Sequence, residues 1–324
     1  MKRWCWAIGL AAAVWGASPA LLSGDAMQAR TMTLTEVLSI GGLESDTLFM
    51  WAGIAVDEQD AIYVTDVMDH SLKKFDAGGR LLKKTGRKGE GPGEFQFPLA
   101  LTRSHDRLYV QEQHRRGIQV FDLDLNFVRI ISCREAFLRI KAAPDSRLAV
   151  LPITPRGEGR LLFIDERGEA VKTFPFSDKP LGLMMDQIDF VLEPGGGLLA
   201  VFNYRDRIER FGPSGKSLWS KNLLDVKKTR TFTAAGRTLP SDLIYRSVAR
   251  DSKGRILILS GDKSPHPARD VFVLSPAGEL MTTLTLPDST HLIHIDGKDF
   301  LYARADSGVT LKKYRMRWGS IQPN

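Results

Sequence analysis

Short apolar runs, separated by turns rich in Gly, Asp and Pro, dominate the chain beyond residue 30. The first group of runs comprises Ile54–Asp57, Ala61–Val64, Ser71–Asp76 and Arg80–Thr85. Runs of this length, rich in β-branched and aromatic residues, indicate β-strands, and almost no stretch has the period of a helix. The pattern therefore predicts an all-β protein built from four-stranded units.

The second group of runs repeats the first at a fixed displacement. Val64 and Val110 are 46 positions apart, and Phe75 and Phe121 have the same separation. Weaker copies of the strand pattern include Arg147–Val150, Gly197–Val201, Asp251–Ile258 and His294–Tyr302. Self-similarity at a fixed period is typical of repeat architectures, and it predicts six copies of one structural unit.

The two ends of the repeat array are complementary. The sixth copy ends after its third strand, Val309–Tyr314, whereas Thr33–Gly42 resembles a fourth strand with no first three before it. The N-terminal strand should therefore complete the last sheet, which closes a ring and removes exposed sheet edges. Six four-stranded sheets around an axis form a β-propeller. We expect this six-bladed propeller to span residues 31–318, followed by a tail of residues 319–324.

A glycine-rich stretch, Gly86–Pro98, joins the first copy to the second. No helix pattern follows it, so it does not fit a nucleotide-binding loop. Glycine permits the close approach of a tight crossing between two sheets instead. With the motifs Ile62–Asp66, Asp69–Leu72 and Phe75–Asp76, this stretch resembles the repeats of NHL-type six-bladed propellers. The resemblance covers about residues 54–122 and implies a ring-shaped fold.

The N-terminus is typical of an export signal. Lys2 and Arg3 precede an apolar stretch, Trp4–Leu22, and small residues follow. This layout predicts a secretory signal peptide over residues 1–29, with an uncleaved anchor as the alternative. We expect an exported, periplasmic or extracellular protein with no membrane span in the mature chain. Cys133 would then be the one remaining cysteine, and its place in a strand-like run predicts a buried, inert thiol.

The formal net charge of +7 favours an anionic ligand or partner. We call the four strands of a copy a, b, c and d in chain order. The loops between strands b and c, and between strand d and the next strand a, emerge on one face of the ring. Most loop cations fall on this face, which we call the loop face. Inner-strand cations could make the channel basic as well. The candidate ligand-binding residues are Arg87, Lys88, Arg115, Arg116, Arg139, Lys141, Lys227, Lys228 and Arg250. The longest d–a insertion, residues 225–246, lies on the same face and could dock a partner.

No catalytic motif emerges from the sequence. There is no Gly-x-Ser-x-Gly elbow and no defensible Ser-His-Asp order. Aspartates that recur after the first strand of each copy, such as Asp57, Asp251 and Asp296, have a sufficient explanation as turn formers. Some six-bladed propellers that this chain resembles are lyases or lactone hydrolases that hold a metal in the channel. In the corresponding region this chain offers only Asp189 and His294 as weak metal candidates.

The sequence therefore favours an exported binding module that acts without a cofactor and holds a protein, peptide or anionic glycan on its loop face. A metal-dependent lyase or lactone or ester hydrolase, with a divalent metal in the channel, is the alternative. Nucleic acid is not expected as a partner, because the basic loops lack a run of stacking aromatic residues. One propeller fold hosts many functions, so fold alone does not choose between these hypotheses.

Overall fold

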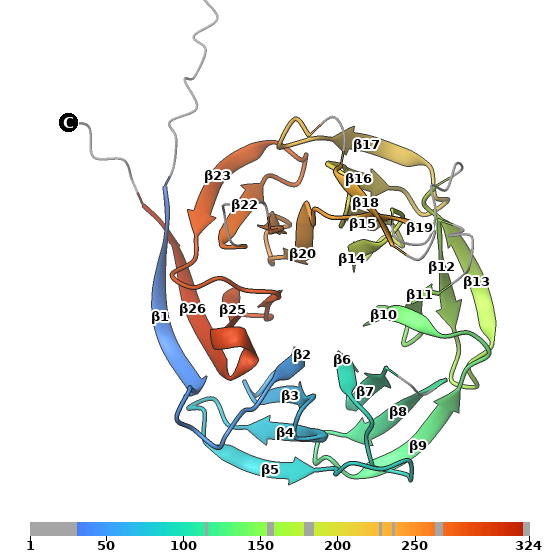
Figure 1. The fold of residues 1–324 in the computed structure, drawn as a ribbon, viewed down its shortest axis with the longest axis vertical. Helices are drawn as coiled ribbons and strands as arrows, with labels where there is room; N and C mark the ends of the chain where they lie inside the picture. The colour runs from blue at the N-terminus through green and yellow to red at the C-terminus, as the bar shows by residue number, and fades with distance from the viewer. Residues whose placement is uncertain are drawn as a thin grey trace, which may run out of the picture.

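The computed structural model describes residues 31–113, 116–153, 159–177, 185–226, 229–234, 237–262 and 268–319. These residues form antiparallel sheets arranged in a ring around a central channel (Figure 1). Six sheets have four strands each, which confirms the six-bladed β-propeller. Apart from strands, the described residues contain one short 3₁₀ turn, Asp306–Gly308.

Each blade runs from an inner strand beside the channel to an outer strand on the rim. Blade 1 contains β2 (Trp51–Val56), β3 (Ile62–Asp66), β4 (Ser71–Phe75) and β5 (Leu81–Thr85). Blade 2 contains β6 (Pro98–Ser104), β7 (Arg107–Glu112), β8 (Gly117–Asp122) and β9 (Phe127–Ser132). Blade 3 contains β10 (Phe137–Ala142), β11 (Leu148–Pro152), β12 (Arg160–Ile164) and β13 (Ala170–Pro175).

The second half of the chain continues this order. Blade 4 contains β14 (Ile188–Leu192), β15 (Leu198–Phe202), β16 (Ile208–Phe211) and β17 (Ser217–Lys221). The expected d–a insertion follows it and carries a separate hairpin of β18 (Thr231–Ala234) and β19 (Arg237–Pro240). Blade 5 contains β20 (Tyr245–Arg250), β21 (Ile256–Ser260), β22 (Asp270–Leu274) and β23 (Leu280–Thr285). Blade 6 contains β24 (Ile293–Ile295), β25 (Phe300–Ala305), β26 (Thr310–Trp318) and β1 (Met32–Gly41).

The N-terminal strand closes the ring as the sequence predicts. β1 pairs antiparallel with β26, from Met32 opposite Trp318 to Gly41 opposite Thr310 (Figure 1). A bulge between Glu36 and Leu38 interrupts the register of this long pair. The first and last strands of the described chain therefore belong to one sheet.

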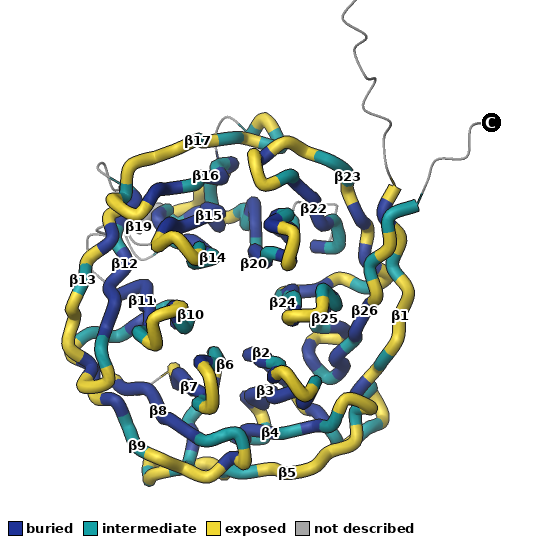
Figure 2. The backbone as a smooth tube through the Cα atoms, turned by 180° about the vertical axis from the view of Figure 1, so that it is seen from behind, coloured by how far each residue is buried: buried dark blue, intermediate teal, exposed yellow. Residues whose placement is uncertain are grey.

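The apolar core is distributed around the ring. Six clusters of buried apolar side chains lie in the described residues, one at each junction between neighbouring blades. Strands such as β3, β11 and β15 are buried at every position, because a neighbouring blade covers each side of the sheet. The outer strands are mainly exposed (Figure 2). Cys133 belongs to the cluster between blades 2 and 3, as expected for an inert thiol.

The glycine-rich stretch is the crossing from blade 1 to blade 2. Phe95 is fully buried in the cluster between these blades, and Lys88 and Phe95 form an isolated parallel bridge. Gly86 has φ +97°, and a Cβ built there would lie 2.5 Å from the Phe95 ring. Both the backbone conformation and the lack of space require glycine at this position.

The recurring aspartates are turn formers. Asp57 accepts hydrogen bonds from the backbone N–H groups of Gln59 and Ala61 and from the Tyr63 hydroxyl. Asp296 makes the same set of contacts in blade 6, ending with the Tyr302 hydroxyl at 2.8 Å. These carboxylates satisfy backbone donors of the turns, so the structural explanation from the sequence is confirmed for them.

The structure has no helix long and apolar enough to cross a membrane in the part of the chain that it describes. The predicted signal segment, residues 1–29, lies outside that part.

Candidate ligand-binding site in the central channel

The channel is lined by the inner strand of each blade: β2, β6, β10, β14, β20 and β24 (Figures 1 and 2). One cavity of about 480 Å³ is lined by residues such as Ile54, Leu101, Arg139 and Asp189. A second cavity, of about 530 Å³, shares Lys141 and His294 with it and extends to the a–b turns. Cavities of this size are typical of small-molecule sites.

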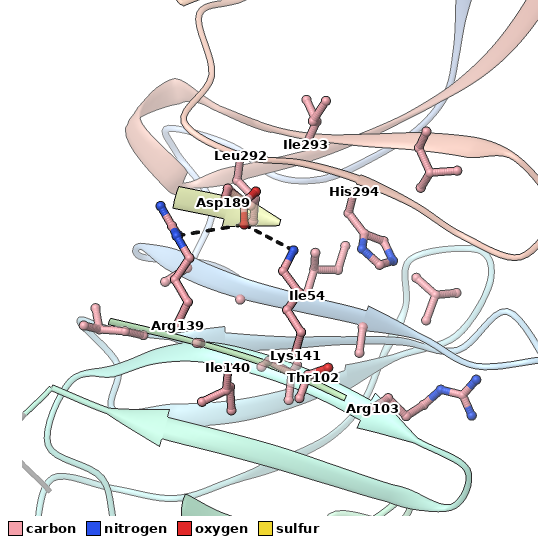
Figure 3. A pocket seen from close by; sticks show the side chains of 18 of the residues that line it. Ile54, Thr102, Arg103, Arg139, Ile140, Lys141, Asp189, Leu292, Ile293 and His294 are labelled. Atoms are coloured by element: carbon pink, nitrogen blue, oxygen red, sulfur yellow. Dashed lines mark ion pairs between the residues drawn. The ribbon is translucent and has the colours of Figure 1, made fainter. Parts of the chain in front are cut away.

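Strand β10 places two cations next to one carboxylate. Arg139 and Lys141 are two residues apart, so they lie on the same face of the strand. Arg139 Nε lies 3.9 Å from Oδ1 of Asp189 on β14, and Lys141 Nζ lies 3.4 Å from the same oxygen (Figure 3). Arg139 Nε also donates to the backbone carbonyl of Ile188 at 3.0 Å.

Asp189 connects three blades. Its side chain is buried, and its Oδ2 accepts a hydrogen bond of 2.8 Å from the backbone N–H of Val248 on β20. Burial raises the pKa of Asp189, but the nearby charges of Lys141 and Arg139 and the Val248 N–H lower it more, so the net pKa is below its usual value. The carboxylate is therefore ionised and holds the two cations of blade 3 in place.

Arg139 and Lys141 have N–H groups that make no hydrogen bond to the described residues. About a third of each side chain is exposed to the cavity. Neither the terminal nitrogens of Arg139 nor Nζ of Lys141 has a hydrogen-bond partner among the described residues. Two positive charges thus share one negative charge and face an open volume, which is an arrangement that attracts an anion.

The other channel cations, Arg103 and Arg250, also lie near carboxylates. Arg103, near the a–b end of β6, makes two hydrogen bonds to the Glu58 carboxylate at 2.5 and 3.0 Å. Arg250, at the a–b end of β20, lies 4.0 Å from Glu193, whose carboxylate also accepts from Arg210. Arg103 therefore has a carboxylate of its own, whereas Arg250 shares Glu193 with Arg210 in the way that Arg139 and Lys141 share Asp189. The pair on β10 differs in that both of its cations line the cavity of about 480 Å³.

His294 lines the same cavity from β24 (Figure 3). Burial, and secondarily the charge of Lys141, lower the pKa of His294 to about 4. The imidazole is therefore neutral near pH 7 and adds no charge to the site.

The two weak metal candidates, Asp189 and His294, face one cavity but have different surroundings. The Asp189 carboxylate is committed to Lys141, Arg139 and Val248. Within the described ranges, no three His, Cys, Asp or Glu side chains are grouped in a way that could hold a metal ion.

The loop-face candidates are not gathered with the channel residues. Arg87 is exposed and pairs with Glu94 at 2.7 Å, while Lys88 contributes its backbone to the blade crossing. Arg116 is exposed beside β8, and Arg115, Lys227 and Lys228 lie outside the described residues. None of the described loop candidates lines either channel cavity.

Sequence reasoning missed the apolar part of the site. Ile54, Leu101 and Leu292 line the cavity that holds the two cations. Ile54 and Leu101 stand in predicted strands, where alternation does not distinguish a side chain in a core from one beside a channel, and Leu292 lies just outside the predicted strand of the sixth copy.

No family model matches the chain. Solved structures with the same architecture include a protein of Bacteroides fragilis that is proposed to be exported, with 10% identity and a TM-score of 0.60 over 89% of this chain and 96% of that chain. A protein of unknown function from Bacteroides thetaiotaomicron has 11% identity and a TM-score of 0.59 over 89% and 76% of the two chains. Virginiamycin B lyase from Staphylococcus aureus has 13% identity and a TM-score of 0.56 over 88% and 99%. At this identity the similarity establishes the propeller fold alone.

Proposed function

We propose that the chain is an exported binding module that holds an anionic ligand, anchored in the central channel. One observation carries this proposal: Arg139 and Lys141 share the single carboxylate of Asp189 and open into a cavity of about 480 Å³. A partly desolvated site strengthens the attraction between such cations and an anion relative to open water.

The loop face would add to this function by guiding or docking the partner that carries the anion. A protein, a peptide or an anionic glycan remains the proposed partner class, with Arg87, Lys88 and Arg116 on the described part of that face. The β18–β19 hairpin belongs to the insertion on the same face. Inserted loops on a rigid scaffold are frequent sites of recognition, which supports this role.

A metal-dependent enzyme that acts in the channel is the second candidate. Two observations favour it: Asp189 and His294 line one cavity, and virginiamycin B lyase has the same architecture. A divalent metal would need further ligands beyond these two side chains. Metal analysis of the purified protein and calorimetric titration with Mg²⁺, Mn²⁺ and Ca²⁺ would separate this candidate from the binding module.

Native mass spectrometry of the exported protein, purified from the cells that produce it, tests the main proposal. We expect an anionic ligand on the wild-type protein that is lost from the Arg139→Gln/Lys141→Gln variant. The control is Arg129→Gln/Lys172→Gln, which removes two cations from outer strands. A ligand retained equally by all three proteins, or no anion on the folded wild-type protein, would overturn the proposal.

A further inference from the structure

The charges around the channel cations define the charge of the ligand. Arg139 and Lys141 face one ionised carboxylate, Asp189, which leaves one positive charge in excess. The other carboxylate in the cavity lining, Asp296, is engaged with its turn, the Tyr302 hydroxyl and Lys313. Uncompensated charge in a partly buried site is unfavourable, and a single negative charge on the ligand would balance it.

The donors also fit a particular headgroup. Arg139 offers a planar fork of N–H groups whose terminal nitrogens have no partner among the described residues, and Lys141 adds a compact point charge. A carboxylate has two oxygens that match the guanidinium fork and carries one negative charge. A phosphate monoester carries close to two negative charges at neutral pH and would leave the site with a negative excess.

The rest of the cavity defines the body of the ligand. Beside the charged groups, the lining has aliphatic side chains that are exposed or half-buried: Leu99, Leu138, Leu292 and Ile295. Among these, Leu99 is 40% exposed, although its side chain is large and apolar. Aliphatic walls of this kind favour an apolar chain, because contact with them removes its surface from water.

Sugars and nucleotides fit this lining less well. The described residues that line this cavity include no Phe, Tyr or Trp, so the small ring of His294 is the aromatic surface on which a base would stack there. The nearest larger ring, Phe190, lines the adjoining cavity and has Lys141 Nζ 5.9 Å from its centroid. Two of the polar side chains are already engaged: Thr102 accepts a hydrogen bond from the backbone N–H of Ala142, and Arg103 is paired with Glu58. Arg139, Lys141 and His294 therefore remain as side-chain partners for the many hydroxyl groups of a glycan.

We infer that the channel binds an aliphatic monocarboxylate, with its carboxylate at Arg139 and Lys141 and its hydrocarbon body along Leu99, Leu138 and Leu292. This inference rests on the proposed function, because it names the ligand class of the same site. Asp189 acts as the charge selector: it cancels one of the two positive charges and so sets the preference for a monoanion.

Calorimetric titration with decanoate tests the inference, with acetate, decanamide and decyl phosphate as comparison probes below their aggregation concentrations. Decanoate should bind the wild-type protein at least about 100-fold more tightly than acetate, because each buried methylene adds to affinity. It should also bind at least about tenfold more tightly than neutral decanamide or decyl phosphate. Arg139→Gln and Lys141→Gln should each weaken decanoate binding by at least about tenfold.

Asp189→Asn separates a charge selector from a structural residue. Asparagine keeps an oxygen for the Val248 N–H but leaves both cations uncompensated, so the variant should bind decyl phosphate more tightly than decanoate. Circular dichroism and thermal unfolding show whether each variant folds. If Asp189→Asn fails to fold, the Leu292→Asn variant tests the body of the ligand: decanoate binding should weaken by at least about tenfold while acetate binding is unchanged.

The outcomes distinguish the inference from the proposed function. Equal affinity for acetate and decanoate would overturn the aliphatic ligand and leave the anion site in place. Tighter binding of decyl phosphate than decanoate by the wild-type protein would overturn the carboxylate. No binding of any of the three anions, with ligand also absent in native mass spectrometry, would overturn both.

Discussion

Lys73 and Asp66 form a buried ion pair in blade 1, with Nζ and Oδ2 2.8 Å apart and the two side chains 2% and 0% exposed. The Asp66 carboxylate also accepts the backbone N–H groups of Phe49 and Met50, which lie in the connector that enters the blade. The pair therefore fastens the crossing between blades 6 and 1 to the inner part of the sheet.

Removal of Lys73 should be strongly destabilising. Lys73→Met leaves the buried Asp66 carboxylate without its cation, and we expect a loss of about 3–5 kcal/mol in the free energy of unfolding. The adjacent Lys74 pairs with Asp124, whose side chain is 80% exposed, so Lys74→Met should cost less than about 1 kcal/mol. Denaturant unfolding of both variants checks the difference, and equal losses would contradict the role assigned to the buried pair.

Ring closure predicts a second contrast between two positions of β1. Ile40 is 3% exposed and packs with Trp51 and Leu311 between blades 6 and 1, whereas Val37 is 41% exposed. Ile40→Ala should lower the free energy of unfolding by about 2–5 kcal/mol. Val37→Ala should change it by about 0.5 kcal/mol or less. If Ile40→Ala were as mild as its control in urea unfolding, β1 would contribute little to closing the ring.

The half-buried imidazole of His294 predicts a loss of stability in mild acid. Its pKa falls from 6.5 in the unfolded chain to about 4 in the fold, so between these values the unfolded chain binds a proton that the folded chain does not. This contribution is complete above pH 6.5 and is lost as the pH falls towards 4, with an upper limit of about 3 kcal/mol.

His294→Gln should therefore show a flatter dependence of unfolding free energy on pH between 6.5 and 4 than the wild-type protein. The same pair of proteins compared at pH 7.5 controls for changes in packing. Parallel curves for the two proteins across this range would show that His294 does not titrate as the structure indicates.

The loop face predicts a charge-reversal effect on partner capture. Changing Arg115, Arg116, Lys227 and Lys228 to Glu should weaken capture of an anionic partner by at least about tenfold, because the mutated face would repel it. Pull-down from the envelope fraction measures this effect, and thermal unfolding checks that the variant is folded. Unchanged capture would remove the loop face from the proposed function and leave the channel site untouched.

The fold was predictable because equivalent residues of the first two blades recur 46 positions apart in the sequence. Asp66 and Lys73 in blade 1 correspond in that register to Glu112 and Gln119 in blade 2. The Gln119 side chain donates to Glu112 at 2.8 Å, and Glu112 accepts the backbone N–H of Gln96 in its own connector. One architectural contact is thus built from an ion pair in one blade and from an amide and a carboxylate in the next.

The channel site was predictable only in part. The sequence identified Arg139 and Lys141 as inner-strand cations, because their strand can be aligned with the other copies. It could not pair them with Asp189, which lies on a different blade and is also bonded to Val248 of a third. Such contacts depend on the twist and spacing of the blades, and alternation along one strand carries no information about them.

The pairing of β1 with β26 also has a kinetic consequence. The Thr33 side chain bonds to the carbonyl of Arg317, and these residues are 284 positions apart in the chain. Contacts between such distant segments form slowly, because much chain entropy is lost before they are made. β1 cannot pair with β26 until almost the whole chain has been synthesised, and until then its backbone donors and acceptors have no partner strand. The unfinished ring is therefore the stage at which aggregation or proteolysis competes most strongly with folding.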